Sequence, residues 1–306
     1  MFNDSAQQRL LLETYQLVLD HLKQFAPGKV ARYIHTRQKR RLQKKNYTDI
    51  LPALTYFASG GRLDESARRE EVCRLCACWM LYTLSARIFD DIVDQEGERN
   101  PWNKHGIIQA LPTGLFFLGV AQTIVSQMSL DGELIVVIND AFGRAIAFAA
   151  QAELKSATRR HQQVTLPQYF DNITGKTGVV FGLGAWMGGR LHTCDEQVLN
   201  CLMQYGINAG IGGQIIDDCG NIRIDLERGV FTLPIIYATQ NDQTILPQLT
   251  VSPTSKGSIR QLERAIKRTG ALASARTTAG AFYSSALDWV SGLPDTTCLQ
   301  QYLQNS

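Results

Sequence analysis

The sequence has little of what marks a disordered, disulfide-stabilised or nucleic-acid-binding protein. Only 9 of its 306 residues are proline and 44% are hydrophobic, which excludes a disordered or collagen-like chain. The 31 basic and 28 acidic residues leave a net charge of +3, which does not indicate a nucleic-acid partner. Seven cysteines are too few to form a disulfide framework in a chain of this length. These absences favour an ordinary globular protein.

Targeting and membrane-spanning signals are also missing. Residues 2–8 contain neither a basic start nor an apolar run, so no signal peptide is expected. The most apolar stretch, around 114–125, is interrupted by Gln122 and is too short for an uncharged membrane span. We therefore expect a soluble, cytoplasmic protein that is not integral to a membrane and binds no nucleic acid.

Apolar residues recur at helical spacing along most of the chain. Leu75, Trp79, Tyr82 and Ala86 form one such stripe, and no segment alternates convincingly with a period of two. Glycine and proline fall where helices should end, and no long linker separates two domains. The pattern predicts a single all-α domain over residues 1–306, with helices at about 5–24, 47–58, 67–94, 108–128, 131–156, 166–172, 175–190, 195–218, 231–240, 257–268 and 271–290.

A first acidic motif lies at residues 90–94. On a helix, Asp90 and Asp94 project from the same face because they are four residues apart, and Asp91 is offset by about 100°. Like charges this close raise each other's pKa unless a cation intervenes. Oxygen-only clusters suit Mg²⁺, which is usually bound through one or two carboxylates together with substrate phosphates. One such motif alone is weak evidence for a metal site, because it occurs by chance on many solvated helices.

A second acidic motif makes the first informative. Asp217, Asn221 and Asp225 are spaced at i, i+4 and i+8, and Asp218 follows Asp217 directly. The three form one helical stripe if the helix continues through Gly220. Two such clusters can face one another inside a helix bundle and build a metal site there. The alternative is a pair of unrelated acidic helix ends.

Lys176 and Thr177 lie between the two motifs. A phosphate-binding P-loop would need glycine where the chain has Phe170, and a preceding strand, so this is not one. Within a helical region the pair is still suited to a diphosphate, because Lys176 supplies a point charge and Thr177 a hydroxyl.

Taken together, the motifs resemble those of the trans-prenyl diphosphate synthases, the polyprenyl synthetase family. The matching pieces appear in family order and cover roughly residues 70–240: DDIVD at 90–94, Gln151, KTG at 176–178, GQIIDD at 213–218 and TLPIIYA at 232–238. The resemblance implies an isoprenoid-synthase-type helical bundle around a deep central cavity. It also implies Mg²⁺ ions that bridge the aspartates to the diphosphate of an allylic prenyl substrate, whose ionisation leaves a carbocation.

The resemblance also implies a role for each matching residue. Asp90, Asp91 and Asp94 match the first metal-binding motif, and Asp217 and Asp218 match the second, with Asn221 where a third aspartate is usual. Lys176 and Thr177 match the residues that hold the allylic diphosphate, and Gln214 matches the glutamine before the second motif. Asp90, Asp91, Asp94, Lys176 and Asp217 are therefore the predicted catalytic residues.

The chain departs from the family where isopentenyl diphosphate should bind. Around Arg62 it keeps one cation of the family's basic motif and has acids where later cations are expected. After the first motif it has one arginine, Arg99, where two are usual, and Val230 replaces a lysine. A doubly anionic acceptor needs several clustered cations, best supplied by arginine. The pattern therefore leaves two kinds of acceptor open, isopentenyl diphosphate and a molecule without a diphosphate.

Two alternatives to a prenyltransferase stay open. Asp217, Asn221 and Asp225 have the spacing of the second metal triad of class I terpene cyclases, which need no acceptor site and act on farnesyl or geranylgeranyl diphosphate. A non-catalytic regulatory subunit would instead predict eroded aspartates.

The resemblance also bears on the length of the prenyl chain. In chain-elongating relatives the positions of Ser85 and Ala86 carry bulky residues that close the cavity, so the small residues here imply room for a prenyl chain longer than farnesyl. The resemblance also implies a homodimer, because members of the family are mostly homodimers.

Overall fold

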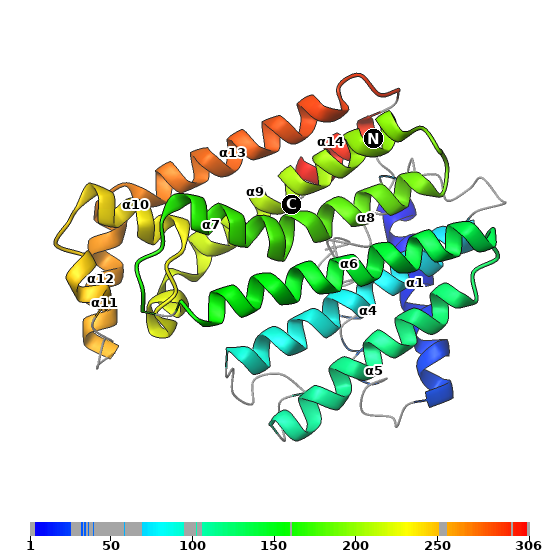
Figure 1. Cartoon of the computed structure of the whole chain (residues 1–306), viewed down its shortest axis with the longest axis horizontal. Coiled ribbons are helices and arrows are strands. Elements are labelled where there is room, and N and C mark those ends of the chain that lie inside the picture. The colour runs from blue at the N-terminus through cyan, green and yellow to red at the C-terminus, as the bar shows by residue number, and fades with distance from the viewer. Residues whose placement is uncertain are drawn as a thin grey trace. The chain divides into compact units, whose positions relative to one another are not determined.

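The computed structural model contains only helices in the part of the chain that it describes. That part comprises residues 4–25, 69–94, 106–159, 161–250, 256–294 and 296–304, together with positions 32, 34, 36, 39, 58 and 102. No strand occurs among these residues, and the all-α prediction is confirmed. The helices (Figure 1) are α1 (Asp4–Phe25), α4 (Arg69–Val93), α5 (Ile107–Ser126), α6 (Gly132–Ala157), α7 (Leu166–Ile173), the π-helical turn η1 (Thr174–Gly178), α8 (Val179–Arg190), α9 (Glu196–Arg228), α10 (Leu233–Asn241), α11 (Leu246–Thr250), α12 (Lys256–Arg268), α13 (Ala271–Val290) and α14 (Thr297–Gln304).

Most predicted helices are found close to their predicted positions. The predicted helix at 47–58 lies outside the described residues except for position 58. Helix α9 ends at Arg228 rather than at 218, because Cys219, Ile222 and Leu226 continue its buried stripe. The short helices α11 and α14 were not predicted. The continuity of α9 through Gly220 confirms that the second motif lies on one helix.

The chain divides into two compact units, each assembled from separate stretches of sequence. Unit 1 comprises Met1–Gly143, Gly184–Asn200 and Pro294–Ser306, and unit 2 comprises Arg144–Leu183 and Cys201–Leu293. The first acidic motif belongs to unit 1, whereas Lys176 and the second motif belong to unit 2. The single domain over 1–306 and the deep central cavity stay predictions.

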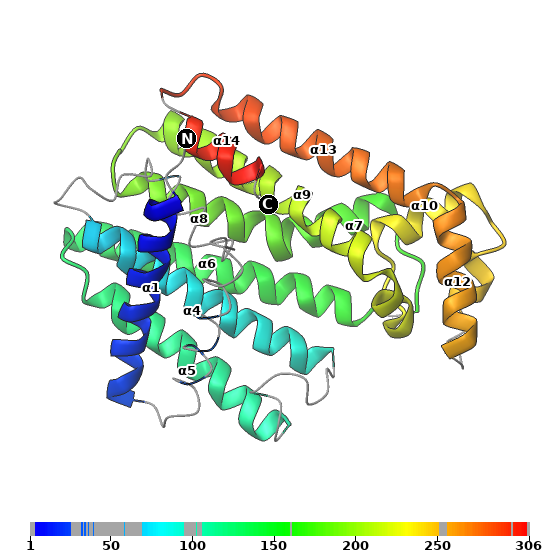
Figure 2. The same cartoon turned by 180° about the vertical axis from the view of Figure 1, so that it is seen from behind.

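Helix α4 is the core helix of unit 1. It packs against α5 and α1 (Figures 1 and 2). The rings of Trp79 and Tyr82 lie 5.2 Å apart, and Phe142 packs 5.0 Å from Trp79. Near the C-terminal end of α4, a Cβ atom on Gly114 would lie 2.6 Å from the Phe89 ring, so glycine there lets α5 approach closely. This packing fixes the end of α4 that carries the first acidic motif.

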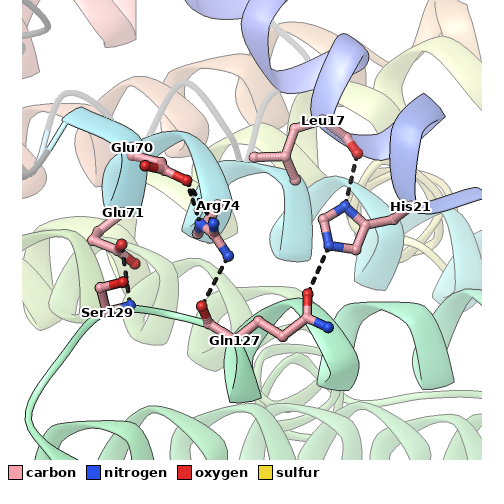
Figure 3. A network of polar contacts seen from close by, with 7 residues as sticks. All are labelled: Leu17, His21, Glu70, Glu71, Arg74, Gln127 and Ser129. Atoms are coloured by element: carbon pink, nitrogen blue, oxygen red, sulfur yellow. Dashed lines mark hydrogen bonds and ion pairs between the residues drawn. The ribbon is translucent and has the colours of Figure 1, made fainter.

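Polar contacts hold the N-terminal half of α4 (Figure 3). Arg74 Nη1 donates to the backbone oxygen of Gln127, 2.9 Å away, and the Ser129 amide donates to Glu71 Oε1 at 3.1 Å. His21 of α1 lies with its Nε2 3.1 Å from Gln127 Oε1. The turn after α5 is thus joined to both α1 and α4.

Two of the described helices, α4 and α5, are long and apolar enough to cross a membrane by length and composition. In α4, 72% of the apolar window is buried inside the protein, as in the core helix of a soluble protein, but in α5 only 33% is buried. The exposed part of α5 includes several large apolar side chains.

Helix α9 is the core helix of unit 2. Ile215, Ile222 and Leu226 join a buried cluster with residues of α7, α10, α12 and α13. A Cβ atom on Gly206 would lie 2.5 Å from the backbone oxygen of Phe181, and one on Gly210 would lie 3.2 Å from that of Thr177. Glycine at i and i+4 therefore lets the backbone of α9 lie directly against η1 and the start of α8.

Candidate active site

The turn that carries Lys176 and Thr177 is π-helical. Helix α7 begins at a capping box in which the Gln168 amide donates to Thr165 Oγ1, and its last residue, Ile173, leads directly into η1. Widened turns of this kind are frequent at functional sites, because they displace side chains and backbone groups from the regular helical ladder. Both side chains are half-buried in unit 2.

Lys176 forms an ion pair that the sequence analysis did not anticipate. Its Nζ lies 2.7 Å from Glu153 Oε2 of α6, and the two side chains are 35% and 20% exposed. A phosphate bound by Lys176, as the sequence predicts, would have to compete with Glu153 for this cation.

A chain of hydrogen bonds runs from Thr177 to the second acidic motif. Thr177 Oγ1 donates to Gln214 Oε1 at 2.8 Å, and Gln214 Nε2 donates to Asp218 Oδ1 at 2.9 Å. The hydroxyl of Tyr169 donates to Asp218 Oδ2 at 2.6 Å. Three predicted site residues of unit 2, Thr177, Gln214 and Asp218, are therefore joined by hydrogen bonds, and Tyr169 is added to them; their role in substrate or metal binding stays a prediction.

Burial dominates the electrostatics of Asp218. Desolvation raises its pKa to about 6, although the hydrogen bonds from Tyr169 and Gln214 act in the opposite direction by favouring the charged form. Burial and the neighbouring charge of Asp218 raise the pKa of the Tyr169 hydroxyl, so it stays a hydrogen-bond donor. Asp217, the residue before Asp218, is exposed to solvent.

The stripe of Asp217, Asn221 and Asp225 is unequal along its length. Asn221 Nδ2 donates to Asp217 Oδ2 at 2.9 Å on the open side of α9. Asp225 is buried and accepts from the Thr232 hydroxyl at 3.1 Å, and burial followed by the charge of Asp218 raises its pKa to about 8. Asp225, which lies nearest the C-terminal end of α9, thus points into the protein rather than toward solvent.

In unit 1 the first motif lies at the end of α4. The Asp94 amide donates to the Asp90 carbonyl at 2.8 Å, so helical geometry continues through the motif. Asp90 and Asp94 are half-buried, whereas Asp91 is buried and accepts from the indole Nε1 of Trp102 at 2.7 Å.

The other predicted substrate-binding residues are only partly described. Ser85 is buried and its hydroxyl donates to the Gly114 carbonyl at 2.9 Å, and Ala86 is half-buried. Arg62 and Arg99 lie outside the described residues. Among the residues that the structure does describe, no three acidic, histidine or cysteine side chains converge as a complete metal-ligand set.

Comparison with known proteins assigns the class. A family model described as polyprenyl synthetase matches residues 28–269. The chain is 28% identical over 243 residues to an all-trans-nonaprenyl-diphosphate synthase of Rhodobacter capsulatus, covering 72% of each chain. It is 28% identical over 138 residues to a geranylgeranyl diphosphate synthase of Saccharolobus solfataricus, covering 43% of this chain and 42% of that one.

The fold agrees with these matches. A heptaprenyl diphosphate synthase from Staphylococcus aureus superimposes with a TM-score of 0.85 at 18% identity, over 97% of this chain and 96% of that one. The fold is thus that of an all-α isoprenoid synthase. The chain belongs to the polyprenyl synthetase family. The matched region spans 42% and 60% of the lengths of the geranylgeranyl synthases of Saccharolobus solfataricus and Geoglobus acetivorans.

No role was predicted from the sequence for Glu153, Tyr169 or Trp102. Glu153 follows the family-matching Gln151 by two residues, and Tyr169 lies seven residues before Lys176, which is two helical turns. Spacing of this kind was the available signal. It could not show which side chain would reach Asp218 or Lys176.

Proposed function

We propose that the protein is a Mg²⁺-dependent prenyltransferase that ionises an allylic prenyl diphosphate and transfers the prenyl group. The observation that carries the proposal is the hydrogen-bonded set in unit 2, in which Thr177, Gln214 and Asp218 connect the turn bearing Lys176 to the second acidic motif. Relatives named as prenyl diphosphate synthases support the same activity.

Each unit by itself offers oxygen donors of the kind that a hard divalent cation takes. In unit 1 Asp90 and Asp94 are half-buried, and in unit 2 Asp217 is exposed and Asn221 half-buried. A Mg²⁺ ion held by these side chains would also take phosphate oxygens of the substrate. When bound, Mg²⁺ neutralises the charge that develops on the leaving diphosphate.

The chain's own residues bind and orient the substrate. Lys176 holds the diphosphate as a point charge, and Thr177 is fixed beside it by its bond to Gln214. Asp218 and Asp225 of the second motif are buried, and hydrogen bonds from Tyr169 and Thr232 hold their carboxylates in place.

The acceptor is proposed to be a molecule other than isopentenyl diphosphate. The sequence around Arg62 and Arg99 supplies too few cations for a second diphosphate, and Val230 is uncharged. An acceptor without phosphates needs no such cluster.

A terpene cyclase gains no support from the second motif. Its triad would need Asp217, Asn221 and Asp225 to act together, but Asp225 is buried and held by Thr232. The retained aspartates and Lys176 likewise argue against a silent regulatory subunit.

We also propose a homodimer in the cytoplasm, not integral to a membrane. Helix α5 exposes a stripe of large apolar side chains in unit 1: Ile107 is 58%, Ile108 84%, Leu111 44% and Leu115 56% exposed. An apolar face of this kind marks a contact surface. Replacing Ile108 and Leu115 by glutamate should convert a dimer into a monomer in light scattering, and a monomeric wild-type protein would refute the proposal.

The test of the activity is an incubation with Mg²⁺ and geranyl, farnesyl or geranylgeranyl diphosphate, with and without isopentenyl diphosphate, analysed by mass spectrometry. We expect Mg²⁺-dependent release of diphosphate without efficient elongation, and in the absence of the proposed acceptor water captures the allylic cation to give a prenyl alcohol. Elongated diphosphates would show that the acceptor is isopentenyl diphosphate after all. Cyclic hydrocarbons from the allylic substrate alone would establish the cyclase. The absence of turnover under every condition would leave either an acceptor missing from the incubation or a silent subunit.

A further inference from the structure

In both acidic motifs, the second aspartate of the Asp-Asp pair is buried and accepts a hydrogen bond from a buried aromatic side chain. In unit 2, Asp218 is 6% exposed and Tyr169, its donor, is 4% exposed; the bond is 2.6 Å long. In unit 1, Asp91 is 5% exposed and Trp102 is 4% exposed, with a bond of 2.7 Å. The two units arrive at the same arrangement from unrelated elements.

Helical geometry explains why these aspartates turn inward. On a helix, successive side chains point in directions about 100° apart. When the first aspartate of a pair faces solvent, as Asp217 does, the second therefore points to another side of the helix. The inward carboxylate loses its water and needs donors to stay charged. A buried tyrosine hydroxyl or indole N–H meets this need with few rotatable bonds, so the carboxylate is held in one place.

In unit 2 the donor is itself placed firmly. Tyr169 lies one turn into α7, which starts at the Thr165–Gln168 capping box and continues into η1. The other oxygen of Asp218 accepts from Gln214, which in turn accepts from Thr177. A single continuous helical segment therefore carries both Tyr169 and the turn bearing Lys176.

We infer that Tyr169 and Trp102 are positioning residues for the two acidic motifs. Tyr169 acts through Asp218 and Trp102 acts through Asp91. Each hydrogen bond fixes the orientation of its helix about the helix axis, and so fixes the direction of Asp217 on α9 and of Asp90 and Asp94 on α4. The inference rests on the proposed function, because it supposes that these carboxylates take part in binding a divalent cation with a diphosphate.

The test measures cation binding rather than turnover. Mn²⁺ replaces Mg²⁺, and its binding to the full-length protein is followed by electron paramagnetic resonance with an allylic thiodiphosphate that cannot ionise. Tyr169→Phe keeps the ring and removes only the hydroxyl. It should weaken Mn²⁺ binding by about ten-fold, as expected for loss of a hydrogen bond to a charged group.

A matched control is available in the same unit. Tyr237→Phe also removes a tyrosine hydroxyl with a hydrogen-bond partner, here Thr278 Oγ1 of α13 at 3.1 Å, which is not a residue of the acidic motif. It should leave Mn²⁺ binding unchanged. For Trp102→Phe, which should weaken binding similarly, Trp289→Phe on the surface of α13 is the control.

A double-mutant cycle separates positioning from a general loss of packing. If Tyr169 acts through Asp218, adding Tyr169→Phe to an Asp218→Asn protein should change Mn²⁺ binding by less than two-fold. Wild-type affinity in Tyr169→Phe, or full additivity in the cycle, would overturn the inference while leaving the proposed function intact. A wild-type protein that binds no Mn²⁺ with the thiodiphosphate would overturn both. Far-UV circular dichroism confirms that each variant is folded.

Discussion

Replacing Glu153 by glutamine removes the carboxylate with which Lys176 pairs and keeps nearly the same shape. At 2.7 Å, two unit charges attract by about 6 kcal/mol in a medium of effective dielectric constant about 20. The pair is 35% and 20% exposed, so desolvation and screening reduce its net worth to about 1 kcal/mol. A diphosphate that binds Lys176 has to displace Glu153, which costs about 1 kcal/mol of its binding free energy.

We therefore expect Glu153→Gln to lower the KM for the allylic diphosphate by about five-fold, which is what about 1 kcal/mol corresponds to. The value of kcat should change little, because the pair affects binding of substrate and transition state alike. Steady-state kinetics at fixed Mg²⁺, with released diphosphate as the readout, measure both constants.

Asp171→Asn is the control for this experiment. Asp171 pairs with Lys155 in the same unit at 3.0 Å, but the side chains are 61% and 43% exposed and neither is a predicted site residue. Its KM should equal that of the wild type. An unchanged KM in Glu153→Gln would refute the reasoning, and a raised KM would mean that Glu153 assists substrate binding instead of competing with it.

Three further predictions follow from the same contacts. Asp90→Ala or Asp217→Ala should abolish Mg²⁺-dependent turnover while circular dichroism shows unchanged helix content; activity retained in both would refute the site. Because the pKa of Asp225 is raised to about 8, the folded protein keeps a proton that the unfolded chain releases, so the free energy of unfolding of the metal-free protein should fall as pH rises from about 4 to about 8. In urea titrations Asp225→Asn should flatten this dependence, and an equally steep slope in the variant would contradict it. Gly206→Ala should destabilise the protein by about 2 kcal/mol or more, because its Cβ would lie 2.5 Å from a backbone oxygen. Gly220→Ala in the same helix, with nothing within 4 Å, should instead stabilise it by about 1 kcal/mol, and equal effects would refute the packing argument.

The helices of the fold were largely predictable because they depend on local pattern. Apolar spacing gave α4 nearly to the residue, and the i, i+4, i+8 spacing of Asp217, Asn221 and Asp225 anticipated a helix that continues through Gly220. The end of α9 was placed too early, because an acidic and glycine-containing segment interrupts the apolar pattern while Ile222 and Leu226 remain buried. The motifs were specific enough to identify the family, which the family model confirms.

The sequence determined which residue types stand at each motif and on which helices they lie, because both depend on neighbours in the chain. Only the tertiary structure decided which carboxylates are held inside. Asp217 and Asp218 are chemically identical neighbours, yet one is exposed and the other accepts from Tyr169, 49 residues away. The pairing of Lys176 with Glu153 likewise depends on α6 and η1 packing in one unit. Burial and hydrogen bonding between distant segments arise from packing, and no local pattern contains them.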